Sequence, residues 1–304
     1  MKRGWVWLLA ICAGGLLVSP RVARGWGNAG HEAVVAVALQ FDPSLRPRVE
    51  AILTNLPASQ KWKDLRATGL IPHNLYQTEK KDPDAWVKAL ASDAEKAATF
   101  PDWARDYEGY RRQEYAKWHF MDLDYDNPED QRFVERPNSL TMLPVLEAEL
   151  KTADAGERAW ALAWVMHLVG DMHQPLHDAT RSLPNDETKS DHGGNDVAYE
   201  NMKLHAFWDH LPDHSAQNNP PAYAAGLLAS LKKMKKSARA EFEKKSSDLD
   251  PEHWVAEGHD LICTIGYPSD QKVANYDAAA HRIADAQVLL AGVRLAKLLE
   301  RDLP

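Results

Sequence analysis

Two histidine–aspartate pairs with the same spacing are the residues best suited to chemistry in this chain. His167 and Asp171 are four residues apart in the apolar stretch Trp160–Met172, and His205 and Asp209 repeat that spacing. In a helix, this spacing puts both side chains on one face, one turn apart. A core-facing aspartate costs free energy unless it is paired or bound to a metal. For a single pair, a buried hydrogen bond and a metal site remain equally good interpretations.

Other histidines surround these two pairs along the chain. His119 lies among aromatic residues, His31 lies near the amino-terminal end, and His177 follows Pro175. Proline disfavours a helical conformation at the residue before it, so we expect His177 in a loop and assign His173 to packing. Two pairs with further histidines favour a metal centre, and imidazole with carboxylate suits zinc. The spacing alone predicts a metal site and does not specify a reaction.

The first 25 residues have the composition of a secretory signal peptide. A short basic start precedes the apolar run Trp5–Val18. This run is too short to span a bilayer, for which about 20 residues are needed. Ala23 and Gly25 supply the small residues that favour cleavage before Trp26. We therefore expect an exported protein, periplasmic or secreted, with no stable membrane anchor after cleavage; a membrane anchor or a buried amino-terminal helix is the alternative.

The composition is that of a soluble globular protein. The chain has 304 residues, of which 44% are hydrophobic and 26% are charged. These values exclude a mainly disordered chain, and two cysteines are too few for a disulfide scaffold. Removing the four basic residues of the first 25 lowers the formal charge from −8 to −12. Such a charge argues against a broad basic groove for nucleic acid.

The elements that must position these side chains are predicted to be helices. Helical periodicity dominates and alternating strand patterns are nearly absent, so we predict an all-α fold, a single compact multi-helix domain over 26–304. Helices are expected over His31–Phe41, Asp84–Thr99, Glu157–Met172, Tyr223–Lys245 and Gln271–Leu303, and loops over Pro57–Pro72, Asn127–Pro137 and Arg181–Asn195. The cluster Lys232–Lys236 is more consistent with a solvated helix face than with a binding patch.

Six short blocks carry a resemblance to a known family. They are Trp26–His31, Phe100–Arg105, Trp118–Asp122, His167–His177, Gly193–Asn195 and Leu204–Asp209, and they occur in the family's order. On these blocks the chain resembles the single-strand-specific zinc nucleases of fungi, plants and bacteria, the S1/P1 type. That family is related in fold to bacterial zinc phospholipase C. The resemblance runs from Trp26 to about Leu299.

The resemblance implies three zinc ions (Zn²⁺) per chain, held by nine residues. The first zinc would be held by Asp102, His119, His167 and Asp171. The second would be held by His177, His205 and Asp209. The third would take the free α-amine and carbonyl of Trp26, with His31 and a shared oxygen of Asp171. An uncleaved precursor would lack that amine, so processing would complete the site; the alternative for Trp26 is a plain surface aromatic.

Asp102 is the ligand that departs most from the family's pattern. Phe-Pro precedes it where the family has Trp-Ala, and Asp106 and Asp93 are alternatives. We prefer Asp102 because Arg105 follows three residues later, as a basic residue does in the family.

Zinc lowers the pKa of bound water, so the implied cluster would supply hydroxide near neutral pH for attack on a phosphodiester. Its positive charge would hold phosphate within an acidic protein. Asp102 is the candidate to orient or deprotonate the water, and Arg105 and Asn195 are candidate donors to phosphate oxygens. The alternatives are a surface ion pair for Arg105 and a turn residue for Asn195.

The resemblance further implies a base-binding site. Phe120 would stack on a nucleobase and Asp122 would hydrogen-bond the edge of the base; the alternative for Phe120 is a core position. Stacking contributes roughly 1–3 kcal/mol per base and tolerates different bases. The implied substrates are single-stranded DNA and RNA and nucleotides, cleaved to 5′-phosphorylated products, with 3′-nucleotidase activity as a further expectation. No protein partner is evident.

Two other functions compete with this expectation. A zinc phospholipase C would use the same cluster, but the bacterial lipases of that type have Glu where this chain has Asp209. A structural zinc protein without turnover would normally close its site with protein ligands, and an amine-terminated cluster is hard to explain in that way.

Overall fold

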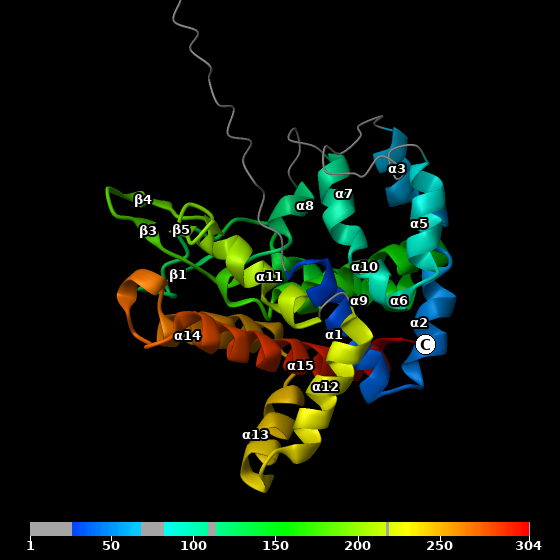
Figure 1. Cartoon of the computed structure of the whole chain (residues 1–304). Helices are drawn as coiled ribbons and strands as arrows, with labels where there is room; N and C mark the ends of the chain where they lie inside the picture. The colour runs from blue at the N-terminus through cyan, green and yellow to red at the C-terminus, as the bar shows by residue number, and fades with distance from the viewer. Residues whose placement is uncertain (1–25, 68–81, 109–113, 217–218, 304) are drawn as a thin grey trace, which may run out of the picture.

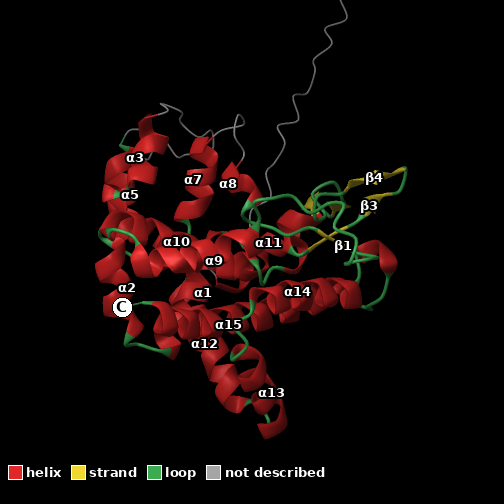
Figure 2. Cartoon of the chain, turned by 180° about the vertical axis from the view of Figure 1, so that it is seen from behind, coloured by secondary structure: helices red, strands yellow, loops and turns green. Residues whose placement is uncertain are grey.

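The computed structural model describes residues 26–67, 82–108, 114–216 and 219–303. These residues form a mostly helical fold, which confirms the predicted all-α class. Three helices lie at its centre and pack against one another: α1 (Asn28–Phe41), α10 (Ala155–Asp171) and α15 (Tyr276–Asp302) (Figures 1 and 2). The predicted helices 31–41, 157–172 and 271–303 correspond to these three.

The other helices surround this centre. They are α2 (Leu45–Leu53), α3 (Gln60–Ala67), α5 (Pro83–Ala91), α6 (Ala94–Ala97), α7 (Phe100–Glu108), α8 (Glu114–Lys117), α9 (Ser139–Thr152), α11 (Leu204–Ala216), α12 (Pro220–Lys233), α13 (Lys236–Ser246) and α14 (Pro251–Ile265). Three 3₁₀ turns connect them: η1 (Leu56–Ala58), η2 (Pro175–His177) and η3 (Pro268–Asp270).

α10 is the central helix because nearly every side chain in it is apolar. From Ala159 to Asp171 each residue is buried, so the helix is covered on all sides rather than on one face. Asp154 caps its amino terminus by accepting hydrogen bonds from the amides of Gly156 and Glu157. The helix ends at Asp171, four residues before Pro175, which places two polar side chains of its last turn inside the core.

Two predicted helices are each interrupted. The helix expected over 84–99 is α5 and α6, because the Asp93 carboxylate accepts from the Lys96 amide and starts a new helix there. The helix expected over 223–245 is α12 and α13, because Met234 and Lys235 adopt extended backbone conformations between them. In both cases the hydrophobic pattern continues across a break that the local backbone makes.

Two predicted loops contain regular structure. The segment 57–72 includes η1 and α3 over its described part, while residues 68–72 lie outside the described residues. The segment 181–195 contains an antiparallel hairpin of β3 (Ser182–Leu183) and β4 (Asp186–Ser190). The segment 127–137 is a loop, as predicted.

The other strands of the described chain are also very short. β1 (Leu123–Asp124) pairs in parallel with β2 (Ala179–Thr180), and β5 (Ala198–Tyr199) pairs with β6 (Met202–Lys203) in an antiparallel hairpin. The β1–β2 pair brings the segment after α8 next to the segment after η2. His119 lies in the first of these segments, and His177 ends η2 directly before the second.

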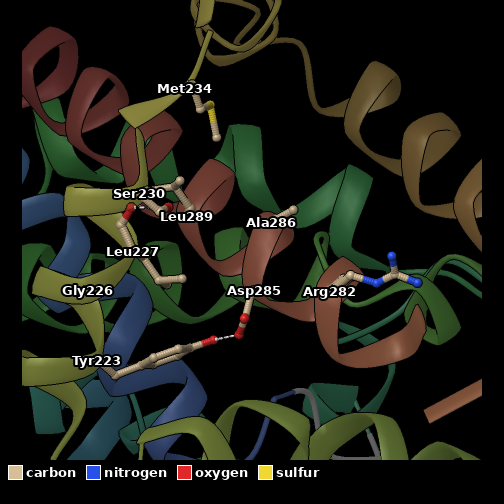
Figure 3. A pocket seen from close by; sticks show the side chains of 9 residues that line it. All are labelled: Tyr223, Gly226, Leu227, Ser230, Met234, Arg282, Asp285, Ala286 and Leu289. Carbon is tan, nitrogen blue, oxygen red and sulfur yellow. Dashed lines mark hydrogen bonds between the residues drawn. The ribbon is translucent and has the colours of Figure 1, made fainter. Parts of the chain in front are cut away.

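A cavity of about 460 Å³ lies between α12 and α15, near the end of α12 (Figure 3). Leu227, Met234 and Leu289 line it, and the Tyr223 hydroxyl donates to the Asp285 carboxylate at its edge. None of the histidine–aspartate pairs lines it. Among the described residues, every helix is too short or too polar to cross a lipid bilayer.

Candidate metal centre

The last turn of α10 presents the first predicted pair to the interior. His167 and Asp171 are fully buried, and His167 Nε2 lies 3.2 Å from Asp171 Oδ2. The i, i+4 spacing thus brings the two side chains together on one face of the helix, as the sequence predicts. The pair is also part of a larger cluster that other elements complete.

Histidines from two distant segments meet this pair. His119 Nδ1 lies 2.9 Å from Asp171 Oδ2 and 2.9 Å from His167 Nε2. The His31 ring, from the first turn of α1, stacks on the His167 ring with centroids 3.7 Å apart. His31 Nε2 lies 3.4 Å from Asp171 Oδ1. Both histidines are completely buried.

Asp102 joins the same cluster from α7. Ligand atoms of His31, Asp102 and His167 all lie within 4.8 Å of one another. The alternative residue Asp93 caps α6 instead, and the side chain of Asp106 lies outside the described residues. Of Asp102 and Asp93, the fold thus brings the preferred Asp102 to the histidines.

Arg105 forms a buried ion pair with Asp102, with Nη1 2.9 Å from Oδ1. Only 4% of Arg105 is exposed, so the predicted alternative of a surface ion pair is wrong. Burial alone would raise the pKa of Asp102, but Arg105 first and the neighbouring histidines next outweigh it, and the net pKa is lowered. The carboxylate is therefore ionised at neutral pH.

A second group lies beside the first and includes the second predicted pair. His177 from η2 and His205 and Asp209 from α11 place ligand atoms within 4.8 Å of one another. His205 Nε2 lies 3.6 Å from Asp209 Oδ1. Asp171 Oδ1 lies 3.8 Å from His177 Nδ1, so this carboxylate borders both groups.

Backbone carbonyls hold three of the histidine rings. The Nδ1 atoms donate to the carbonyls of Ala98 (from His167, 2.8 Å), His119 (from His177, 2.5 Å) and Gly193 (from His205, 2.7 Å). A carbonyl can only accept, so each Nδ1 carries a proton, and in a neutral ring this leaves the lone pair on Nε2. Histidines that bind metals are oriented by such partners on the other nitrogen.

Several buried polar atoms of the cluster have no hydrogen-bond partner among the described residues. They are both ring nitrogens of His31, Nε2 of His119 and Oδ1 of Asp171. Leaving a buried polar group unsatisfied costs about 1–3 kcal/mol. A cation bound among these atoms would remove this cost, so the residues fit a metal. Three buried His/Asp groups could each hold an ion, with His167 shared between two of them.

In the first group, the pKa values of Asp171, His119 and His31 are shifted towards the forms that can bind a metal. Burial would raise the pKa of Asp171, but His167 and His177 outweigh burial and hold it well below its usual range. Burial lowers the pKa of His119 to about 4, and burial and then His167 lower that of His31. The pKa of His167 is raised instead, because its attraction to the Asp171 carboxylate outweighs the effect of burial.

For Asp209, in the second group, the effects that raise the pKa outweigh those that lower it. Burial raises its pKa well above the usual range, and Asp171 and Asp102 raise it further. Gln174 opposes this by donating from Nε2 to Asp209 Oδ1 at 2.8 Å. A cation in this group would relieve the repulsion between these carboxylates.

Trp26 begins the described chain and is completely buried, so the alternative of a surface aromatic is wrong. The amide of Gly27 donates to the Asp209 carbonyl at 2.7 Å. The amide of Gly30 donates to Asp213 Oδ1 at 3.2 Å. α11 thus holds both the Asp209 ligand and the turn that follows Trp26.

Two glycines to which the sequence analysis assigned no role make room for the cluster. A Cβ atom on Gly170 would lie 2.8 Å from His31 Nδ1, so α10 can approach His31 only with glycine there. Gly193 has φ +60°, and a Cβ atom on it would lie 2.4 Å from the Leu176 carbonyl oxygen. For Gly193, the available signal was the pair of consecutive glycines within the predicted loop 181–195.

The predicted phosphate donor Asn195 directly follows Gly193 and Gly194 and lies in the same turn. Its Nδ2 donates to the His192 carbonyl at 2.8 Å, and its amide donates to the same carbonyl at 3.1 Å. These two hydrogen bonds close a turn, which agrees with the alternative interpretation of Asn195 as a turn residue. The Asn195 side chain is half-buried, so its remaining polar atoms are not enclosed.

The predicted base-binding residues follow His119 directly. Phe120 is half-buried and is absent from the apolar core formed by the described residues, so a core position is wrong. Asp122 is buried and has a left-handed backbone conformation, with φ 50°. Burial raises the pKa of Asp122 well above its usual range, and Asp191 and Glu135 add to this effect. A protonated carboxyl group can donate a hydrogen bond as well as accept one.

Known proteins resemble this chain over most of its length. A family model described as S1/P1 Nuclease matches residues 26–303. Nuclease S1 from Aspergillus oryzae is 24% identical, with 96% of each chain covered. Nuclease P1 from Penicillium citrinum is 23% identical over 70% of this chain and 87% of that protein. Endonuclease 3 from Arabidopsis thaliana is 25% identical over 98% of this chain and 96% of that protein.

Proposed function

Because this chain belongs to the S1/P1 nuclease family, we propose that it is a zinc-dependent endonuclease of single-stranded DNA and RNA. The products would be 5′-phosphorylated, and the same site would remove phosphate from 3′-nucleotides. One observation carries the proposal: two adjacent buried His/Asp clusters meet at Asp171, and the first of them holds buried polar atoms with no hydrogen-bond partner among the described residues.

Three zinc ions are the cofactors that we propose for this centre. Bound zinc would supply a nucleophile from water near neutral pH and positive charge for the phosphate. Asp102, His119, His167 and Asp171 would hold the first ion, His177, His205 and Asp209 the second, and Trp26, His31 and Asp171 the third. The Nε2 atoms of His167, His177 and His205 would be the ligand atoms, because their Nδ1 atoms already donate to carbonyls.

Asp102 and Arg105 would act on the water and on the phosphate. Asp102 is ionised, so it can accept a hydrogen bond from the attacking water and orient it. Arg105 would donate to a phosphate oxygen while it keeps Asp102 charged. Asn195 would donate from the edge of the site, and its bond to the His192 carbonyl leaves its second amide hydrogen for that role.

Phe120 and Asp122 would bind the base on one side of the scissile bond. The half-buried Phe120 ring offers a face for stacking, which any base can use. Asp122, kept protonated by burial, could both donate to and accept from a base edge. A base must leave its partner strand to reach such a site, which explains a preference for single strands.

Export is the remaining part of the proposal. Residues 1–25 would be a signal peptide, and 26–304 would be the mature nuclease domain. The family model begins its match at residue 26, where the predicted cleavage occurs. The mature protein would be periplasmic or secreted.

The test uses the signal-cleaved chain loaded with zinc, single-stranded and duplex DNA as substrates, and a chelator. We expect rapid cleavage of the single strand and slow cleavage of the duplex. Chelation and the substitution His167→Ala should each reduce the rate at least about a thousandfold, in the range measured when a main catalytic element is removed. His253→Ala is the matched control, because His253 is 62% exposed and pairs only with Asp248 among the described residues.

Two outcomes would separate the parts of the proposal. A protein that carries three zinc ions and cleaves no nucleic acid would contradict the substrate, and phospholipid would be the next phosphoester to test. Full activity of the His167→Ala variant would contradict the assignment of the centre itself.

A further inference from the structure

The break between α12 and α13 produces a projecting basic corner. Lys232 and Lys233 end α12, and Lys235 and Lys236 begin α13. We call these four residues the lysine corner. In both overall views α12 and α13 extend from the edge of the molecule opposite α7 and α8 (Figures 1 and 2). A continuous helix, as the sequence predicted, would have spread these charges around a solvated surface.

The lysine corner gathers four lysines that have no acidic partner in the part of the chain that the structure describes. All four residues are exposed, and no ion pair joins them to any carboxylate of the described chain. Elsewhere, Lys61 pairs with Glu149 at 2.8 Å and Lys117 pairs with Glu135 at 2.7 Å. Four adjacent unpaired cations repel one another, so an anionic partner would lower their free energy.

The base of this projection is fixed to the body of the molecule. The buried Arg294 donates from Nη2 to the Lys245 carbonyl at 3.1 Å and pairs with Glu257 at 2.9 Å. Lys297 Nζ donates to Ser247 Oγ at 2.8 Å. The corner is therefore presented at a defined place and not on a free segment.

Nucleic acid suits the lysine corner better than a membrane does. A helix that binds in a membrane interface needs an exposed apolar face beside its cations. The exposed large hydrophobic residues of the described chain are Phe41, Val145 and Met202, and none of them lies on α12 or α13. Phe242 of α13 is half-buried and packs against the core. Cations without an apolar face fit a phosphate backbone, which binds through charge alone.

We propose that the lysine corner is a second contact site for nucleic acid, which holds the phosphate backbone of a long strand away from the metal centre. The inference rests on the proposed function, because the strand is the proposed substrate. Holding one part of a strand raises the effective concentration of the rest at the metal centre. A dinucleotide is too short to reach both places, so the lysine corner should matter only for long substrates.

The test compares the zinc-loaded mature protein with the variant Lys232→Gln, Lys233→Gln, Lys235→Gln, Lys236→Gln. Binding is measured by fluorescence anisotropy with a DNA duplex, a polyanion that a single-strand-specific enzyme leaves intact. The slope of log affinity against log salt should become shallower by about 3–4, since each lost phosphate contact removes about 0.9. The KM for a strand of ~60 nucleotides should rise about tenfold, with dinucleotide kinetics unchanged.

Two controls separate charge from structure and position. The fourfold Lys→Arg variant keeps the charges and should bind as the original does. Replacing Lys63, Lys88, Lys189 and Lys203 with Gln removes the same charge elsewhere and should change the salt slope little.

Unchanged duplex binding in the fourfold Gln variant would overturn the proposal. So would loss of binding to phosphatidylglycerol vesicles with strand binding intact, because the partner would then be a membrane. If the unaltered enzyme cleaves no nucleic acid, the proposed function fails, while duplex binding still decides the role of the lysine corner.

Discussion

At the scale of single residues, the candidate metal centre depends on how closely backbone can approach imidazole. The Gly170 position on α10 leaves no space for a methyl group, because His31 Nδ1 lies 2.8 Å from where a Cβ atom would be. Gly226 on α12 is the opposite case, with nothing within 4 Å of its Cβ position. The same substitution should therefore have opposite effects at the two sites.

We predict that Gly170→Ala displaces His31 and weakens metal binding, with a loss of stability of about 1–3 kcal/mol from overpacking. Gly226→Ala should instead stabilise the helix by about 0.5–1 kcal/mol. Metal content by elemental analysis and denaturant unfolding of both variants measure the two effects. A Gly170→Ala protein with a full complement of zinc would show that His31 has more freedom than the packing indicates.

Residue types and their spacing singled out the two histidine–aspartate pairs, and the family resemblance added residues such as Asp102, but neither predicted what orients these side chains. The ligand side chains could be predicted because imidazole and carboxylate are rare in apolar sequence. The carbonyls of Ala98, His119 and Gly193 could not, because every residue has a carbonyl and only the tertiary fold selects one. For the same reason, nothing in the sequence marked Gly170 as a contact of His31.

At the scale of elements, helix identity was predictable and helix boundaries were less so. α10 stands out because its apolar run is long and ends before a proline. The interruptions at Asp93 and at Met234 were missed, since each is a local backbone choice within a continuing hydrophobic pattern. α3 was missed because Pro57 and Pro72 on either side of it suggested a loop.

Arg181 connects the base of the β3–β4 hairpin to η3. Its guanidinium lies between the rings of Tyr125 and Tyr267, 3.8 and 4.0 Å from their centroids, and its Nη1 donates to Asp270 Oδ1 at 2.9 Å. The hydrogen bond from Arg181 lowers the pKa of Asp270 to about 2. A carboxyl group whose pKa is lowered by folding stabilises the fold at pH values above its pKa in the unfolded chain. This contribution is lost as the pH falls through its pKa in the folded protein.

We predict that Asp270→Asn lowers stability at pH 7 by roughly 1–2 kcal/mol, as expected for a hydrogen bond between charged groups. The difference in unfolding free energy between the variant and the original protein should narrow as the pH falls from about 4 towards 2. Thermal unfolding across this pH range measures it. Asp260→Asn on α14 is the control, because that side chain is 87% exposed. An Asp270→Asn difference that does not change with pH would point to packing instead of charge.

At the scale of the whole molecule, the metal centre joins segments from most of the chain. α1 and α7 contribute one side chain each, α10 and α11 contribute two each, and the segment before β1 and the turn η2 bring in His119 and His177. When no cation is bound, this arrangement is opposed by repulsion between the buried carboxylates and by the buried nitrogens of His31 and His119 that have no hydrogen-bond partner among the described residues. The stability of the fold should therefore be linked to metal binding.

We predict that chelation lowers the melting temperature of the mature protein and that zinc restores it. At a hundredfold excess over Kd, each bound ion contributes about 2.7 kcal/mol. Each kcal/mol shifts Tm by about 2–4 °C for a chain of this size. Three ions should together raise Tm by more than ~10 °C, which calorimetry can measure, with Mg²⁺ as the control ion. Identical melting curves with and without chelator would contradict the linkage.

The burial of Trp26 has a practical consequence for anyone who makes this protein. If its α-amine is a ligand, a preparation whose leader is removed one residue early or late would fold, migrate on a gel and elute from a sizing column like the correct product. It would still lack one donor. Batch-to-batch differences in specific activity would then record the accuracy of leader removal, and intact-mass analysis of the amino terminus would be the relevant quality control.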